Sequence, residues 1–219
     1  MARKKGTWRK KTSPGRFLKE SARQFWHVVW EEDTVLSWLL NIALAFILMK
    51  FVIYPGLGLV LSTSHPVVAV VSGSMEHDGV PFDQWYDSQK DFYMSYGISS
   101  EGFFGFPLRD GIDTGDIIVL KGKPPEDLRV GDVIVFNKGG PEPIIHRVVR
   151  KWESGEETYF ETKGDHNPGV SELDRNINGE QVLGRAAVRI PYLGYVKIPF
   201  TRWLACLVTP SNPLCARSS

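Results

Sequence analysis

Ser74 stands near the end of an apolar run, in the stretch VVAVVSGSMEHDG that extends from Val67 to Gly79. A serine hydroxyl is a weak nucleophile until a neighbouring base removes its proton. If Ser74 does chemistry, another segment of the chain must therefore supply that base.

The chain has five histidines, and one of them stands out. His27 and His65 are expected to be exposed polar residues, while His77 and His166 lie in loops rich in Gly or Pro. His146 differs because IIHRVV places its imidazole within an apolar strand, where a polar ring needs a partner. His146 is then either a general base or a core histidine that bonds to the backbone.

The sequence pattern around these residues is typical of a mostly β domain. Short runs rich in Val and Ile are bounded by Gly, Pro and Asn turns, which favours strands. The expected strands are 67–71, 116–120, 132–136, 144–152, 158–163 and 182–190. Between them, residues 80–114 are rich in aromatic side chains, with a short helix expected around Trp85 to Ser95. These aromatics form either a small separate core, which we take as the default, or an interfacial belt.

Residues 35–54 form an apolar stretch of membrane-spanning length that carries one charge, Lys50. A cleaved signal peptide is the alternative, but no clear small-x-small cleavage pattern follows. Pro55, Gly56 and Gly58 are expected to break this helix. Nine Lys and Arg residues precede the stretch, so the positive-inside rule predicts a cytoplasmic N-terminus and an extracytoplasmic domain after Tyr54.

The sequence thus predicts four parts. These are a basic tail with an interfacial amphipathic helix (1–34), a transmembrane anchor (35–54), an extracytoplasmic β-rich domain with an insert at about 80–114 (55–195), and a hydrophobic membrane-associated C-terminal segment (196–219). The last segment is too interrupted for a second span, and Cys206 and Cys215 stay unassigned. A formal net charge of +1 over 219 residues argues against a nucleic-acid partner.

Several short motifs occur in a specific order along residues 70–190. SGSM is followed by two GD-led strands, then by HRVV, TKGDHN and GRA. This series resembles the type I signal peptidases, peptidase family S26. The bacterial branch carries lysine at the position of His146, whereas the archaeal and endoplasmic-reticulum branch carries histidine, as here. The resemblance implies a mainly β catalytic domain behind an N-terminal transmembrane helix.

The resemblance also implies roles for individual residues. Ser74, directly before Met75, matches the nucleophile, and His146 matches the general base. Ser72 matches a position associated with the oxyanion hole, and Val70 and Met75 flank the expected oxyanion and substrate-binding region.

The acidic member follows from the loop TKGDHNPGVSELDRN. Asp165 matches the aspartate of the family's GD turn. The family's histidine branch has a second aspartate six residues later, where this chain has Ser171. We therefore favour Asp174, displaced by a loop insertion, as the carboxylate that orients the base, with Asp165 next as a residue that shapes the site.

His77 stands where the family's serine motif usually has proline, which would place a second imidazole near the cleft. A zinc site built from His77, His146 and His166 is conceivable, but no metal-type pair such as HExxH or CxxC supports it. We expect no metal and no cofactor.

The expected function is a membrane-bound serine endopeptidase that removes signal peptides from secreted preproteins, cutting after small residues at the outer membrane face. The extended substrate would pair with a strand edge at 67–71. Expected partners are signal peptides, membrane lipid and the secretion channel. The archaeal plasma membrane is the favoured location, with the endoplasmic reticulum as the alternative.

Two other readings are open. A membrane-anchored subunit of a secretion complex that binds peptides without cutting them fits the strands and the anchor equally well. Retention of Ser74, His146 and a loop aspartate together favours the enzyme. A self-cleaving repressor-type peptidase shares a related β core, but the anchor, the absence of a DNA-binding segment and the histidine at 146 argue against it.

Overall fold

The computed structural model describes residues 19–20, 26–27, 34–140 and 142–191. Most of the predicted basic tail and interfacial helix lies outside these residues. The predicted C-terminal segment 196–219, with Cys206 and Cys215, lies outside them as well.

One helix runs from residue 35 to residue 61, and it meets the requirements of length and composition for a membrane span. Thr34 caps its start, because Thr34 Oγ1 accepts a hydrogen bond of 3.2 Å from the Ser37 N–H. Within the described residues no other helix meets this test. The helix has three consecutive segments: α2 (Val35–Leu48), the π-helical turn η1 (Met49–Ile53) and α3 (Tyr54–Leu61).

The predicted helix break at Pro55 is wrong, because α3 continues through Pro55, Gly56 and Gly58. The π-helical turn directly before Pro55 explains this continuation. Proline lacks an N–H, and its ring crowds the carbonyl four residues earlier. A π-helical turn bonds across five residues, as Tyr54 N–H does to Met49 O, and such turns are common where a helix absorbs a local irregularity.

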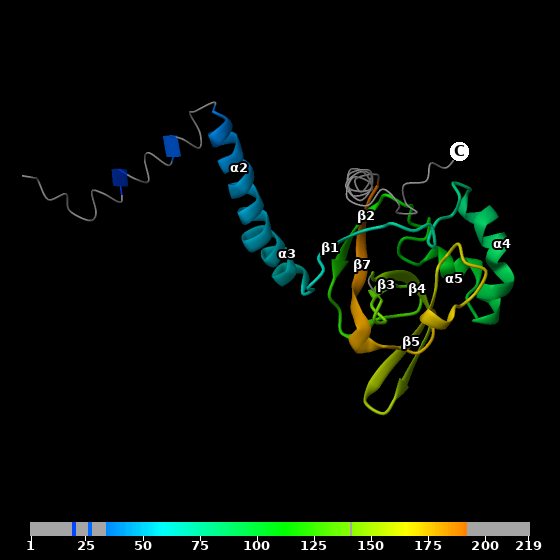
Figure 1. Cartoon of the computed structure of the whole chain (residues 1–219). Coiled ribbons are helices and arrows are strands. Elements are labelled where there is room, and N and C mark those ends of the chain that lie inside the picture. Colours follow the sequence, from blue (N-terminus) through cyan, green and yellow to red (C-terminus); the bar gives the residue numbers. More distant parts are fainter. Residues whose placement is uncertain (1–18, 21–25, 28–33, 141, 192–219) are drawn as a thin grey trace, which may run out of the picture. The chain divides into compact units, whose positions relative to one another are not determined.

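The second part of the chain is a single curled sheet of seven strands that pair antiparallel throughout, in the order β1-β2-β7-β3-β4-β5-β6 (Figure 1). In this order β1 lies at one edge and β6 at the other. The strands are β1 (Val67–Ala69), β2 (Ile117–Lys121), β3 (Val133–Phe136), β4 (Ile144–Ser154), β5 (Glu157–Lys163), β6 (Ile177–Asn178) and β7 (Val182–Ile190).

Apolar side chains fill both faces of the central strand β3. Val133 and Val135 belong to one buried cluster, while Ile134 and Phe136 belong to another. Successive side chains of a strand point to opposite faces, so a strand of four consecutive apolar residues is buried on both sides. This explains why VIVF is an uninterrupted apolar run. All six predicted strands are confirmed, and β6 is an additional strand that the pattern did not reveal.

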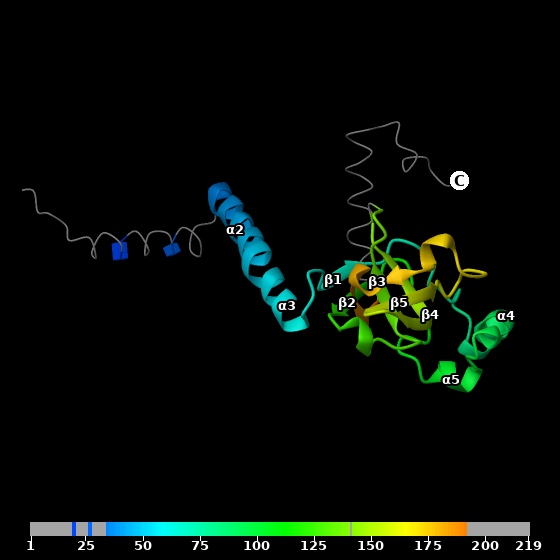
Figure 2. The same cartoon turned by 90° about the horizontal axis from the view of Figure 1, so that it is seen from below.

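The aromatic insert folds into two helices, α4 (Phe82–Ser95) and α5 (Ser100–Phe104). Figures 1 and 2 show these helices side by side, beyond β4 on the side away from β1. Trp85, Tyr93 and Phe103 are buried in a cluster of their own that also includes Val149 of β4. The expected helix near Trp85 and the default expectation of a separate aromatic core are therefore confirmed, while α5 was not expected.

Candidate active site

Strand β4 carries two adjacent polar residues, His146 and Arg147, in an otherwise apolar stretch. Because neighbours on a strand point to opposite faces, the two side chains are directed to different parts of the molecule. His146 opens onto a groove beside Ser74, and Arg147 points into the interior toward the insert. Each of them meets one aspartate of the loop that follows β5.

The imidazole of His146 lies between Ser74 and Asp174. His146 Nε2 is 3.1 Å from Ser74 Oγ, and Nδ1 contacts Asp174 Oδ1 on the other side of the ring. An ionised carboxylate only accepts hydrogen bonds, so Nδ1 carries the proton and donates it to Asp174. The neutral ring then presents the lone pair of Nε2 to the serine hydroxyl, which is the arrangement that general-base chemistry requires.

Asp174 is held in place by its local structure. It ends the short helical turn η3 (Glu172–Asp174), whose capping residue is Ser171. Ser171 donates to Asp174 Oδ2 from Oγ at 2.6 Å and from the backbone N–H at 3.3 Å, and Thr162 Oγ1 donates to Oδ1 at 2.7 Å. Burial acts to raise the pKa of Asp174, but the hydrogen bond from His146, together with those from Ser171 and Thr162, lowers it below its usual value.

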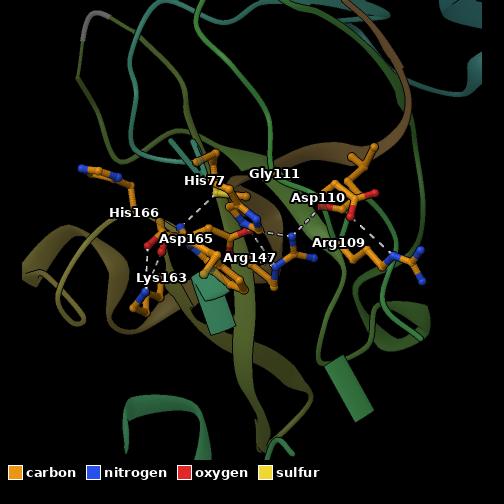
Figure 3. Close-up of polar contacts among 12 residues, drawn as sticks. His77, Arg109, Asp110, Gly111, Arg147, Lys163, Asp165 and His166 are labelled. Atoms are coloured by element: carbon orange, nitrogen blue, oxygen red, sulfur yellow. Dashed lines mark hydrogen bonds and ion pairs between the residues drawn. The ribbon is translucent and has the colours of Figure 1, made fainter. Parts of the chain in front are cut away.

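Asp165 does not contact His146 but forms the centre of a buried network on the other side of β4 (Figure 3). Arg147 binds it through Nε at 2.9 Å and Nη2 at 2.7 Å. His77 Nε2 and Tyr93 Oη each donate to it at 3.1 Å. Burial acts to raise the pKa of Asp165, yet the adjacent Arg147 and His77 hold it well below its usual range.

The Arg147 side chain is fully buried and uses every donor of its guanidinium. Beyond Asp165, Nη1 donates to Pro107 O and Gly131 O, and Nη2 donates to Leu108 O. A buried charge is tolerated only when it is paired and hydrogen-bonded in this way. Arg147 therefore fastens the end of the insert to the strand that carries His146.

Gly164 lets the loop that follows β5 approach Ser74 closely. A Cβ on Gly164 would lie 2.6 Å from Ser74 O and 2.8 Å from His146 Nε2, so any side chain here would collide with both. The next residue but one, His166, donates its backbone N–H to Ser74 O at 2.9 Å. The turn is thus fixed against the residue whose hydroxyl faces the base.

Lys163 is a fully buried lysine at the start of this turn. Its Nζ donates to Gly164 O and Asp165 O at 3.1 Å each, and lies 5.0–5.1 Å from the ring centres of Tyr93 and Phe92. Burial lowers the pKa of Lys163 to about 8, although the charge of Asp165 acts in the opposite direction. The lysine therefore bridges the insert and the loop.

A groove of about 330 Å³ runs past Ser74 and His146. Val70 and Ser72 line this groove, and Ser72 Oγ is 3.4 Å from Ser74 Oγ. The side chain of Met75 is fully buried in the core, where its sulfur accepts a contact from the Asp165 N–H, and Met75 is not among the residues that line the groove. An apolar side chain next to a surface serine packs inward when the serine faces the groove.

The other histidines have different surroundings. His77 is buried and stacks on Trp85 with ring centres 3.6 Å apart, while His166 is exposed and pairs with Asp78 at 3.2 Å. In the part of the chain that the structure describes, no group of three or more His, Cys, Asp or Glu side chains could hold a metal ion.

Sequence reasoning missed three residues that shape the site. The alternation of side chains along β4 is a usable signal for Arg147, because the residue next to a histidine that faces the groove must point to the opposite face of the strand. Thr162 follows from the same alternation on β5 only once the pairing of β4 with β5 is known. Lys163 carries no local signal, since its burial depends on the distant rings of α4.

Comparison with known proteins shows the family of the chain. No family model matches the chain. The chain is 30% identical to the signal peptidase complex catalytic subunit SEC11 of Colletotrichum graminicola over 169 residues, which cover 74% of this chain and 78% of that protein. It is also 30% identical over 178 residues to the SEC11 protein of Komagataella phaffii, covering 74% and 82%. The protein therefore belongs to the family of signal peptidase catalytic subunits, which are serine proteases.

Proposed function

We propose that the chain removes signal peptides with Ser74 as the nucleophile, His146 as the general base and Asp174 as the carboxylate that orients the base. The observation that carries this proposal is the continuous contact from Asp174 through the His146 ring to Ser74 Oγ. Two further observations support the proposal. A groove runs past Ser74 and His146, and the relatives are named as catalytic subunits of the signal peptidase complex.

In the first half of the reaction, Ser74 Oγ attacks the carbonyl carbon of the scissile peptide bond as His146 Nε2 takes the hydroxyl proton. Negative charge then develops on the carbonyl oxygen. The Ser72 hydroxyl lies close to Ser74 and can donate a hydrogen bond to this oxygen. Collapse of this intermediate breaks the C–N bond, and His146 gives its proton to the departing amine. The signal peptide stays attached to Ser74 as an ester.

In the second half, a water molecule takes the place of the amine. His146 Nε2 removes a proton from this water as its oxygen attacks the ester carbon. Collapse breaks the bond to Ser74 Oγ, which recovers the proton from His146, and the signal peptide leaves with a free carboxylate. Asp174 stabilises the positively charged imidazole in both halves without being protonated itself.

The substrate would bind as an added strand along β1. On either side of β1, Pro66 O accepts from the Leu120 N–H and Val70 N–H donates to Asp116 O. By the alternation of an antiparallel pair, the backbone groups of Val67 and Ala69 face away from β2. These outward groups can bind an extended peptide. The apolar groove lining includes Ala69, Ile144 and Leu173. We infer that this lining leaves room only for small side chains next to the scissile bond.

We also propose a location and partners. The helix of residues 35–61 anchors the protein in the membrane, with the N-terminus cytoplasmic and the sheet domain outside the cytoplasm. The archaeal plasma membrane stays our favoured site, with the endoplasmic reticulum as the alternative. The relatives are named as subunits of a complex, so we propose partner subunits together with membrane lipid and the secretion channel.

The test is cleavage of a membrane-inserted preprotein by the detergent-purified full chain. Wild-type protein should cut after a small-x-small sequence. Ser74→Ala and His146→Ala should each lower the rate by roughly 10⁴-fold or more, because the members of such a unit act together. Ser95→Ala, which removes an exposed hydroxyl on α4, serves as the matched control and should cut at the wild-type rate.

Two outcomes would count against the proposal. Full activity of Ser74→Ala would exclude Ser74 as the nucleophile. A folded wild-type chain that binds the preprotein but never cuts it, even in native membranes that supply partner subunits, would favour the non-catalytic peptide-binding role.

A further inference from the structure

Asn167 is a groove residue to which neither the family resemblance nor the triad gives a role. It lies in the same turn as Gly164, and its backbone N–H donates to Gly164 O at 2.9 Å. The neighbouring His166 N–H binds Ser74 O. These two hydrogen bonds fix the backbone of Asn167 relative to the nucleophile, so its side chain occupies a defined place in the groove.

The side-chain amide of Asn167 is directed toward the reacting groups. Asn167 Nδ2 and His146 Nε2 both lie 2.8 Å from the position that a Cβ on Gly164 would occupy, and Ser74 O lies 2.6 Å from it. An amide donor, the atom of the base that moves the proton, and the backbone of the nucleophile therefore converge on one side of Gly164.

The Asn167 amide also differs from the other polar side chains of its turn. Asp165 accepts hydrogen bonds from Arg147, His77 and Tyr93, and the side chain of His166 pairs with Asp78. Within the described residues, no hydrogen bond from the Asn167 amide group is seen, although the side chain is half-buried. A half-buried donor without a protein partner is available to a ligand in the groove.

We propose that Asn167 Nδ2 donates a hydrogen bond to the oxygen of the scissile carbonyl, together with the Ser72 hydroxyl. This inference rests on the proposed peptidase function. A neutral amide suits this task because it stabilises developing negative charge without placing a positive charge beside the imidazole that must accept a proton. The donor strengthens as charge grows on the oxygen, so it acts on the transition state more than on the bound substrate.

The experiment measures kcat and KM for preprotein cleavage by Asn167→Ala and Asn167→Asp in the full-length chain. Asn167→Ala should lower kcat by about 10²-fold or more and leave KM within threefold, since removing one oxyanion donor has an effect of that size. In Asn167→Asp, a carboxylate near His146 favours the protonated ring, so the acidic limb of the pH–rate profile should move to higher pH.

Asn176→Asp is the matched control, because Asn176 is an exposed asparagine that lines a separate cavity. It should change neither kcat nor the pH profile. Thermal unfolding of all variants distinguishes a loss of function from a loss of folding. A folded Asn167→Ala protein with wild-type kcat, or a loss confined to KM, would overturn the inference. The proposed function would still stand in that case, provided that Ser74→Ala is inactive.

Discussion

Each face of β4 pairs a basic side chain with an aspartate, but the two pairs have different surroundings and different chemistry. On one face, His146 meets Asp174 beside an open groove; on the other, Arg147 meets Asp165 in a closed interior. Both aspartates are fully buried and both have lowered pKa values. The first pair includes a base that can exchange a proton, whereas the guanidinium of the second pair keeps its charge at all working pH values.

This difference indicates a division of labour between the faces. Three donors around Asp174 come from the local segment and from β5, so they set the direction of one carboxylate toward the imidazole. Asp165 instead collects donors from β4, from the insert and from the loop after Ser74. We infer that the Asp174 face carries the chemistry and that the Asp165 face holds together the segments that carry it.

The sharpest way to break this comparison is Asp174→Asn. We expect kcat/KM to fall by roughly 10⁴-fold, because an amide in place of the carboxylate favours the wrong tautomer of the base. Thermal stability should change far less than activity. Cleavage kinetics and a melting curve of the same preparation check both statements. Equal activity of Asp174→Asn and wild type would mean that the two faces do not divide the work in this way.

The next largest effect is expected on the closed face. Arg147→Met should lower the free energy of unfolding by about 3–5 kcal/mol, because it leaves Asp165 buried without its charged partner. Arg109→Met is the matched control, since Arg109 pairs with the exposed Asp110 at 3.6 Å, where a pair contributes about 1 kcal/mol or less. Chemical denaturation in detergent measures both. Similar losses in the two variants would contradict the assigned importance of the buried pair.

A smaller effect concerns pH. The pKa of Lys163 is about 8 in the folded protein, against 10.5 for an ordinary lysine. Between these values the unfolded chain binds the proton and the folded chain does not, so this group makes stability rise with pH, by up to about 3 kcal/mol across the window. Lys163→Met should flatten that rise in melting curves, while Lys90→Met, on an exposed part of α4, should leave it unchanged. An unchanged slope in Lys163→Met would show that the lysine titrates as an exposed one does.

The strands of the sheet could be predicted because their signals are local. Segments such as DVIVF are apolar, rich in β-branched residues and bounded by turn residues, and these features act within a few residues. The predicted break at Pro55 also relies on a local signal, and here the local signal is misleading. A rule about one proline ignores the π-helical turn before it, which depends on the geometry of the whole helix.

The candidate site was accessible only in part. The order of the motifs indicated Ser74, His146 and two candidate aspartates, but the choice between the aspartates depends on which one folds back to the ring. Hydrogen bonds decide this: Ser171 and Thr162 hold Asp174 beside the ring, and Arg147 holds Asp165 away from it. Ser171 is only three residues from Asp174, but Thr162 and Arg147 reach their aspartates across 12 and 18 residues, and a motif does not encode which partner each carboxylate finds.

The shortness of the edge strand β1 has a consequence for turnover. An edge of three residues offers few backbone hydrogen bonds, so a peptide added to it is held weakly, and the same shortness limits edge-to-edge aggregation between copies of the chain. A weakly held product leaves quickly. In the proposed membrane setting, confinement of enzyme and signal peptide to one bilayer raises their effective concentration and compensates for the weak contact. Fast product release and low affinity for the peptide would then both follow from the length of β1.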